Sequence, residues 1–252
     1  MKTIVFGAAG WLGRAILANL EGRHEIRAFD MGPEAWKAWE EYDGPWDGGE
    51  VVEGEISDFA SVDRAMEGIE GVIHTAVYFG GDDDDDLPFL VNLKGLWNVL
   101  EIANRRGVRR VVHVGSCQTV HPKGIFFEAD VRRPDASLYA VGKRLQEEMC
   151  RQFYEGTGLS TIVLRPDYIV DSRIALGRQR EKLGPPDGTS TGTGWVCRHD
   201  LAEACRLALE SDTIEHDVFN IVGTPEASKS CNVDRAREAL GFEFKGDLEQ
   251  FR

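Results

Sequence analysis

Tyr139 and Lys143 are the two residues whose types and spacing most directly suggest chemistry. They stand four positions apart at the start of a predicted helix that runs to about Gly156, so both side chains lie on one face of that helix. A phenol with a pKa of about 10 is a poor base at neutral pH, and a nearby ammonium group should lower that pKa by favouring the phenolate. The pair therefore predicts a general base, although a surface tyrosine on a helix can show the same spacing.

Ser116 supplies a third candidate group. It follows a continuous apolar strand predicted over residues 108–114, and a hydroxyl at the end of a neighbouring strand can orient a substrate oxygen. Lys143 can also bind the ribose of a nicotinamide nucleotide. The three groups together indicate a site where a proton is taken from a substrate beside a nicotinamide nucleotide, provided that the chain binds such a cofactor.

The first thirty residues contain the elements that such a cofactor needs. A short run rich in β-branched residues, 3–6, predicts a buried strand, and the glycine-rich stretch 7–13 follows at once. A helix is predicted over residues 14–20 and a second strand over residues 24–30. A glycine trio alone also occurs in ordinary tight turns, but here the strand, the helix and a terminal acid all stand where a dinucleotide motif requires them.

Each glycine of this stretch has a separate role in the predicted motif. Gly7 lets the chain turn sharply off the strand, Gly10 lets the backbone approach a pyrophosphate, and Gly13 lets the helix pack tightly on the sheet. The helix N-terminus then faces the anion with free N–H groups and a positive dipole end. Asp30 can accept hydrogen bonds from the adenosine ribose hydroxyls and would repel a 2′-phosphate, so the sequence predicts NAD rather than NADP.

Strands and helices continue to alternate along the rest of the chain. This alternation implies right-handed crossovers and a parallel sheet, so we predict an α/β fold with a Rossmann-type doubly wound parallel sheet, in a single domain over residues 1–252. The further strands are expected at 50–54, 71–76, 108–114, 160–164 and 218–222, and the further helices at 35–42, 59–66, 90–105, 139–156, 198–209 and 233–240.

Composition and charge narrow the classes of function. The 252 residues are 42% hydrophobic and 29% charged, which allows a normal core, and the net charge of −14 argues against nucleic acid or an anionic membrane as partner. No apolar run reaches the length of a membrane span and no signal-peptide pattern begins the chain, so we expect a cytoplasmic protein. The dispersed cysteines predict reduced thiols and no metal site. They are Cys117, Cys150, Cys197, Cys205 and Cys231.

Several polar residues are expected to have structural rather than catalytic roles. The aspartate run 82–86 is interpreted as a solvated loop because adjacent carboxylates repel one another and the pattern of a calcium loop is absent. His74 and His113 stand within apolar strands and are expected to be core histidines. Ser57 is expected to cap the helix over residues 59–66, and His199-Asp200 the helix that follows them.

Taken together, the motifs resemble those of extended short-chain dehydrogenases/reductases of the NAD-dependent epimerase/dehydratase family, most of all the uronate dehydrogenases. The resemblance extends to about residue 240. It rests on residues 7–13, 72–76, 91–95, 115–120, 139–143, 164–166, 198–202 and 219–221, and for the uronate dehydrogenases on residues 133–143 and on the short C-terminal part.

The resemblance implies a mechanism in which Tyr139 takes the proton of a sugar hydroxyl while a hydride leaves the carbon for NAD, with Lys143 and Ser116 in support. Two residues depart from the family pattern. Cys117 stands where a further hydroxyl is often found, so either Ser116 or Cys117 occupies the catalytic position, and Glu55 replaces a shorter acid near the adenine. The cofactor residues implied are Gly7, Ala9, Gly10, Trp11, Leu12, Gly13, Asp30, Glu55, Ile56, Thr75, Ala76, Val77, Asn92, Tyr139, Lys143 and Pro166. For Asn92, a backbone-bridging amide is an equally weighted alternative.

The substrate that the resemblance implies is a small sugar or sugar acid. Arg173, Arg178 and Arg180 follow Arg165-Pro166 in the segment that closes over the substrate in this family, and a guanidinium matches a carboxylate in a bidentate manner. Residues 171–215 and 223–252 would form a small substrate lobe, and a homodimer is compatible with the family. The implied substrate residues are Ser116, Cys117, Gln118, Tyr139 and Arg173. Two alternatives remain open: a nucleotide-sugar epimerase that uses NAD transiently, and a non-catalytic NAD-binding regulatory protein.

Overall fold

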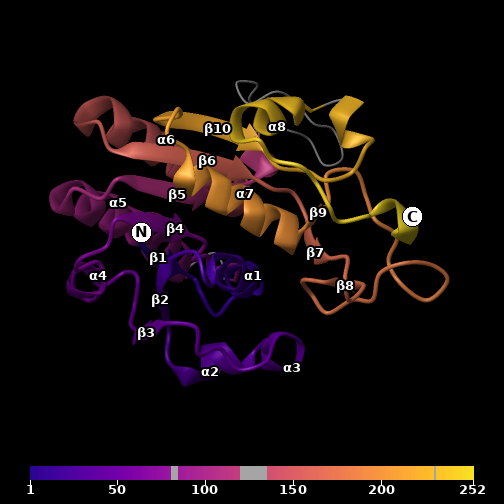
Figure 1. Ribbon diagram of the computed structural model, residues 1–252, viewed down its shortest axis with the longest axis horizontal. Coiled ribbons are helices and arrows are strands. Elements are labelled where there is room, and N and C mark those ends of the chain that lie inside the picture. Colours follow the sequence, from indigo (N-terminus) through magenta and orange to yellow (C-terminus); the bar gives the residue numbers. More distant parts are fainter. Residues whose placement is uncertain (81–84, 120–134, 230) are drawn as a thin grey trace.

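A seven-stranded parallel sheet forms the centre of the protein (Figure 1). The computed structural model describes residues 1–80, 85–119, 135–229 and 231–252. The strand order is β10-β6-β5-β4-β1-β2-β3, and every neighbouring pair runs parallel, which confirms the predicted fold class. The strands are β1 (Lys2–Phe6), β2 (Glu25–Asp30), β3 (Glu50–Glu53), β4 (Gly71–His74), β5 (Arg110–Val114), β6 (Ser160–Arg165) and β10 (His216–Asn220).

Helices cover both faces of this sheet because the inner strands are apolar on both sides. One face is covered by α1 (Trp11–Leu20) and α7 (Arg198–Glu210), which lie side by side in Figure 1 and share a core with β1, β5 and β6. The opposite core belongs to α4 (Phe59–Ala65), α5 (Gly95–Arg106) and α6 (Leu138–Thr157). The chain continues from β1 to β2 on one side of β1, and β4 pairs with β1 on its other side. The strand order therefore reverses beside β1. Doubly wound α/β folds bind ligands at such a topological switch point.

A small second sheet lies beyond the carboxyl ends of the central strands. It joins β8 (Leu176–Gly177), β7 (Ile169–Asp171) and β9 (Val196–Cys197), and Val170, Leu183 and Leu248 form its own apolar cluster. The polar segment 171–194 therefore carries short strands and turns. The C-terminal part of the chain adds α8 (Asp234–Leu240) and the 3₁₀ turns η3 (Ala227–Lys229) and η4 (Glu249–Phe251).

Two expectations about helix caps were wrong, and one expected helix begins in a different form. Asp58, and not Ser57, caps α4, because its carboxylate accepts a hydrogen bond from the Ala60 N–H. The helix expected at 90–105 is present, and its first part is the π-helix η1 (Pro88–Lys94), which continues into α5. His199-Asp200 do not cap α7: His199 contacts the Asp171 carboxylate, and Asp200 accepts hydrogen bonds from backbone N–H groups near the C-terminus, at 245 and 246.

The segment between β2 and β3 also differs from the expected single helix at 35–42. It contains α2 (Pro33–Lys37) and α3 (Glu40–Asp43), separated by a break at Trp39. A further 3₁₀ turn, η2 (Cys117–Thr119), follows β5. Residues 82–84 of the aspartate run, and Arg133-Pro134, lie outside the described residues.

The expectation that His74 and His113 are core histidines is confirmed. Both rings are fully buried on neighbouring strands, and their Nδ1 atoms lie 3.0 Å apart in a hydrogen bond. Burial lowers the pKa of His74 to about 3, with a further contribution from the Lys143 charge, so His74 is neutral at physiological pH.

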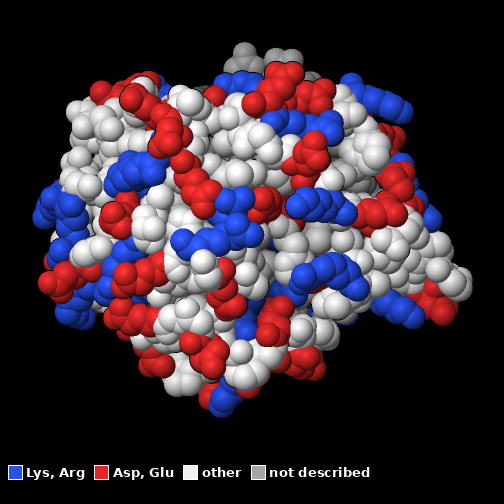
Figure 2. All heavy atoms as spheres, viewed as in Figure 1, with Lys and Arg blue, Asp and Glu red and all other residues white. Residues whose placement is uncertain are grey.

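All five cysteines are free and buried. No helix in the described ranges combines the length and apolar character needed to cross a bilayer. The described side chains also contain no group of three or more His, Cys, Asp or Glu residues arranged to hold a metal ion. Figure 2 shows acidic and basic side chains interspersed on one face of the molecule.

Candidate active site

A cavity of about 1120 Å³ opens at the switch point, over the carboxyl ends of the central strands. Residues that follow β1, β2, β4, β5 and β6 all contribute to its wall, because parallel strands bring their carboxyl ends to one edge of the sheet. The implied site residues that line it are Gly7, Ala9, Gly10, Trp11, Leu12, Gly13, Asp30, Glu55, Ile56, Thr75, Ala76, Val77, Ser116, Gln118, Tyr139, Lys143 and Pro166. Asn92, Cys117 and Arg173 are not among the lining residues.

The glycine stretch forms a cradle that side chains would fill. Gly7 has a φ of +82°, and a Cβ there would lie 2.6 Å from Thr75 Oγ1 and 2.7 Å from the Ala76 nitrogen. A Cβ at Gly13 would lie 2.1 Å from the Gly7 oxygen, so α1 packs directly against the loop before it. Among the described residues, no side chain caps α1 and no acid lies in its first turn. Its first N–H groups thus remain available to a phosphate.

Asp30 closes one end of the cavity at the tip of β2. Its Oδ2 accepts a hydrogen bond of 2.8 Å from the Ala9 nitrogen and its Oδ1 one of 2.8 Å from the Met31 nitrogen. Burial raises the pKa of Asp30 and these two hydrogen bonds oppose the rise. An ionised carboxylate has further lone pairs with which to accept ribose hydroxyls. The glycine cradle and the acid therefore fit a dinucleotide cofactor.

Tyr139, Lys143 and Ser116 converge at the other end of the cavity. Ser137 caps α6 by accepting a hydrogen bond of 3.3 Å from the Ala140 nitrogen, which fixes the first turn that presents Tyr139. Ser116 hydrogen-bonds the Tyr139 phenol. Lys143 lies one turn further on, with its Nζ 5.9 Å from the centre of the Tyr139 ring and 3.0 Å from the Val114 oxygen, to which it donates.

The ionisation of this pair differs from the expectation that Lys143 lowers the pKa of Tyr139. Burial raises the pKa of Tyr139, while the hydrogen bond from Ser116 and the charge of Arg178 act in the opposite direction. Burial also lowers the pKa of Lys143 to about 8. The expectation was wrong because it considered only the charge of the ammonium and not the desolvation of both groups in the cavity wall.

The alternative positions of Ser116 and Cys117 are distinguished by the cavity, which Ser116 lines and Cys117 does not. Cys117 is fully buried outside the cavity, and its Sγ donates a hydrogen bond to the Arg165 oxygen at 3.0 Å. Burial raises the pKa of this thiol, so it is a weak donor with its hydrogen already used. Ser116 faces the cavity and Tyr139. The implied substrate contact of Cys117 is therefore wrong for this structure.

Asn92 bridges the backbone of Tyr78 and does not line the cavity. Its Oδ1 accepts from the Tyr78 nitrogen at 2.8 Å and its Nδ2 donates to the Tyr78 oxygen at 3.0 Å. The backbone-bridging interpretation is thus the one the structure supports. Tyr78 itself lines the cavity, so Asn92 acts on the site only through the loop it holds.

Arg178, and not Arg173, brings a guanidinium to the cavity. Arg173 lies outside it and contacts Asp171 and His199. The Arg178 guanidinium lies 3.9 Å from the ring centre of Phe79, and Phe79 stacks on Tyr139 with a centroid distance of 5.6 Å. Sequence reasoning named Arg178 without selecting it, because the β7–β8 turn decides which arginine points inward. Phe79 was not predicted as a site residue, because its position after β4 is the only feature of the sequence that indicates it.

Comparisons with known proteins agree with this architecture. The sequence matches the NAD-dependent epimerase/dehydratase family over residues 3–222. It is 29% identical to the uronate dehydrogenase of Pseudomonas putida, over all of this chain and 86% of that protein. The fold is similar to those of the uronate dehydrogenase of Agrobacterium tumefaciens (22% identity, TM-score 0.76, 100% and 86% coverage) and the UDP-glucuronic acid 4-epimerase of Bacillus cereus in complex with NAD (17% identity, TM-score 0.79, 100% and 96% coverage).

Proposed function

Because the chain belongs to the NAD-dependent epimerase/dehydratase family, we propose that it is an NAD-dependent oxidoreductase that oxidises a hydroxyl carbon of a sugar acid. The observation that carries the proposal is the convergence of Tyr139, Ser116 and Lys143 on one end of a cavity whose other end is the glycine cradle and Asp30. A dinucleotide bound to the cradle would extend toward these three side chains.

Tyr139 is the base in this proposal. The substrate hydroxyl would lie between the phenol and Ser116, and Tyr139 would take its proton as the carbonyl forms. The Ser116 hydrogen bond and the positive charge of Arg178 both favour the phenolate. NAD, when bound, supplies the acceptor for the hydride that leaves the same carbon. Lys143 contributes a buried amine at 5.9 Å from the tyrosine ring, where it can also hold a ribose hydroxyl.

Tyr139→Phe tests this assignment. The variant should form no NADH from substrate but should still bind NADH, because only the phenolic oxygen is removed. Tyr154→Phe is the matched control: Tyr154 lies on the same helix α6, and its ring stacks on His216 at 5.0 Å. The proposal fails if Tyr139→Phe turns over a sugar-acid panel at a near-normal rate. Equilibration of two nucleotide-sugar epimers by the native protein without net NADH would identify an epimerase instead.

The position of Arg178 supports the proposal that the substrate carries a carboxylate. It belongs to the segment 171–215, which we propose as part of the substrate lobe, and it reaches the cavity beside Tyr139 through Phe79. A charge-assisted hydrogen bond contributes about 1.5–3 kcal/mol, so Arg178→Ala should lower kcat/KM for a uronate by roughly 10- to 100-fold. The neutral parent sugar should lose less, because for it Arg178→Ala removes only the charge that favours the Tyr139 phenolate.

Arg173→Ala is the matched control for the substrate charge, since Arg173 is an exposed arginine of the same segment that lies outside the cavity. It should keep the preference for the uronate. If the native protein prefers the neutral sugar, the sugar-acid substrate is excluded. If the two arginine variants behave alike, Arg178 does not bind the substrate carboxylate.

The compartment and the oligomer are further parts of the proposal. Five free, buried thiols suit a reducing compartment, so we place the protein in the cytoplasm. Leu138, Val141 and Leu145 expose an apolar stripe at i, i+3 and i+7 on α6. Trp97 of α5 is also exposed, and its ring packs on Phe153 further along α6. This surface suits a homodimer. Light scattering should give twice the mass of one chain, and Leu145→Glu should reduce it to that of a monomer.

A further inference from the structure

The segment between β2 and β3 forms one wall of the cavity directly after Asp30. We call residues 31–44, which include α2 and α3, the strap. Met31, Ala35, Ala38 and Trp39 of the strap line the cavity, and the Trp39 ring packs on Trp11 of α1 with a centroid distance of 4.5 Å. Because it lies beside Asp30, the strap borders the end of the cavity assigned to the adenosine of the cofactor.

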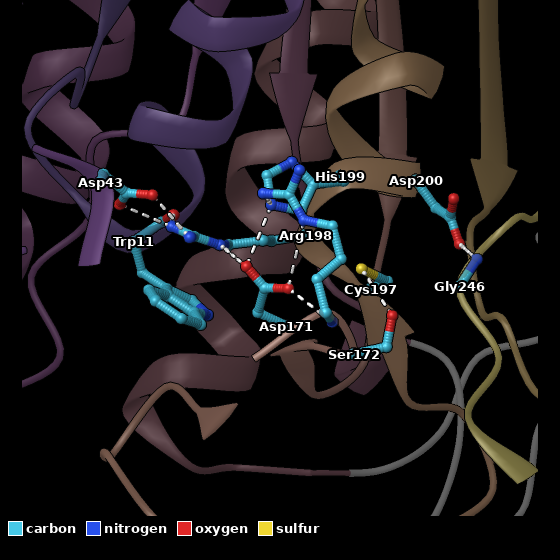
Figure 3. Close-up of polar contacts among 10 residues, drawn as sticks. Trp11, Asp43, Asp171, Ser172, Cys197, Arg198, His199, Asp200 and Gly246 are labelled. Atoms are coloured by element: carbon cyan, nitrogen blue, oxygen red, sulfur yellow. Dashed lines mark hydrogen bonds and ion pairs between the residues drawn. The ribbon is translucent and has the colours of Figure 1, made fainter. Parts of the chain in front are cut away.

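Arg198 fastens the far end of the strap to the rest of the protein (Figure 3). Its Nη1 and Nη2 donate to the two carboxylate oxygens of Asp43 at 2.8 and 2.6 Å, and its Nε donates to Asp171 Oδ2 at 2.7 Å. The guanidinium lies 3.9 Å from the ring centre of Trp11 and also donates to the Trp11 oxygen at 3.2 Å. One side chain thus joins the strap, the glycine-loop helix and strand β7.

The two carboxylates that hold Arg198 differ in how firmly they are themselves held. Asp171 is fully buried and also receives hydrogen bonds from His199 Nε2 at 3.0 Å and from the Arg173 nitrogen at 2.9 Å. Asp43 ends a four-residue helix with no buried residue. If the Arg198–Asp43 ion pair breaks, we therefore expect Arg198 to stay hydrogen-bonded to Asp171 of β7. The strap is then the part that moves away.

A second connection runs from the strap to the turn that carries Arg178. The Arg180 guanidinium lies 5.1 Å from the ring centre of Trp39, donates to the Ala38 oxygen and lies 3.7 Å from Glu41. Arg14 of α1 donates to the Gly44 oxygen at the strap's end. The strap is thus tied from three sides, and the partly buried, bidentate Arg198–Asp43 pair is the strongest of these contacts.

We propose that the strap retains the cofactor, and that Arg198 and Asp43 are positioning residues whose ion pair sets the rate at which NADH leaves. The proposal rests on the proposed function in that the cavity must bind NAD(H). Removing one partner of a hydrogen-bonded charge pair with little solvent exposure acts mainly on dissociation rates. Cofactor release would then require the Asp43 end of the strap to open.

The dissociation of NADH tests the proposal through the tryptophans of the cavity wall. Energy transfer from Trp11 and Trp39 to bound NADH can be followed by stopped flow after mixing with excess NAD. Asp43→Asn removes the charge at constant size and should raise the dissociation rate about tenfold or more, while the association rate changes little. Asp43→Glu keeps the charge and should restore slow release. Asp63→Asn is the control, because Asp63 pairs with Arg106 at 2.8 Å on the surface of α4.

Limited trypsin digestion gives a second measurement that needs no cofactor. Lys37 is the only lysine or arginine between residues 31 and 49, so cleavage after it reports opening of the strap. Asp43→Asn should be cut there about tenfold faster than the native protein and Asp63→Asn at the native rate. Native NADH release or native cleavage in Asp43→Asn overturns the proposal. A native protein that binds no NADH would instead refute the proposed function, even if the cleavage rates behave as expected.

Discussion

Replacing Gly13 with alanine would place a methyl group between α1 and the loop that leads into it. A Cβ at this position would lie 2.1 Å from the Gly7 oxygen, 2.6 Å from the Ala8 oxygen and 2.8 Å from the Ala8 carbonyl carbon. All three atoms belong to the backbone, so no side chain can rotate away. Cβ atoms in proteins essentially never lie closer than 3.0 Å to such an atom, so the start of α1 must move by roughly 1 Å.

The cost of this shift can be estimated from two opposing effects. Overpacking a rigid site costs about 1–3 kcal/mol, and a contact with immobile backbone belongs at the upper end of that range. Alanine returns about 1 kcal/mol through its higher helix propensity. The free energy of unfolding of Gly13→Ala should fall by about 2 kcal/mol, which lowers the melting temperature of a domain of this size by about 4–8 °C.

Gly156→Ala is the matched control because it adds the same methyl group to an exposed position of α6. A Cβ at Gly156 would meet no atom within 4 Å, so only the helix propensity acts, and the melting temperature should rise by at most about 2–4 °C. Thermal unfolding and a fluorescence titration with NADH check both variants. The affinity of Gly13→Ala for NADH should fall several-fold, because the helix N-terminus is displaced from the phosphates. A Gly13→Ala protein that melts at or above the native temperature and binds NADH normally would refute the reasoning.

Three further predictions concern single side chains. Asp30→Ala should lose the preference for NAD over NADP in equilibrium titrations, because the carboxylate that would repel a 2′-phosphate is gone; an unchanged preference contradicts this role. Ser116→Ala should lower kcat by about 10²-fold or more in assays of NADH formation, whereas Cys117→Ala should leave kcat near the native value, because the thiol is buried against the Arg165 oxygen; the reverse order would assign the site to Cys117. Asp171 has a pKa held well below its usual range by hydrogen bonds from His199 and Arg198, so its contribution to stability is complete above about pH 4 and is lost as the pH falls further. The melting temperatures of the native protein and Asp171→Asn should accordingly converge at acidic pH, and a constant difference would argue against the linkage.

Most of the fold could be predicted from the sequence because its signals are local. The β-branched run before Gly7 and the carboxylate at the end of β2 lie within thirty residues of one another. A strand, a turn and a helix of this kind form from neighbours in the chain, and their alternation leaves few topologies. The same applies to Tyr139 and Lys143, whose spacing on α6 follows from the helical period alone.

The sequence could not select among equivalent residues at the cavity. Arg173 and Arg178 are five positions apart in one polar segment, and the β7–β8 turn, which includes Ala175 with a φ of +52°, decides which one faces Tyr139. Ser116 and Cys117 are adjacent, so a rotation of one residue in the backbone after β5 exchanges their surroundings. No local pattern encodes such a rotation.

The sequence by itself determined the doubly wound sheet, the glycine cradle, the acid at its edge and the tyrosine–lysine pair, because each depends on spacings of a few residues. Only the tertiary structure decided the ionisation of Tyr139 and the attachment of the strap. Burial shifts the pKa of Tyr139 through atoms contributed by several elements. The Arg198–Asp43 pair joins residues 155 positions apart. Such contacts form only when complete elements dock, because desolvation and ion pairing depend on distances in space rather than on positions along the chain.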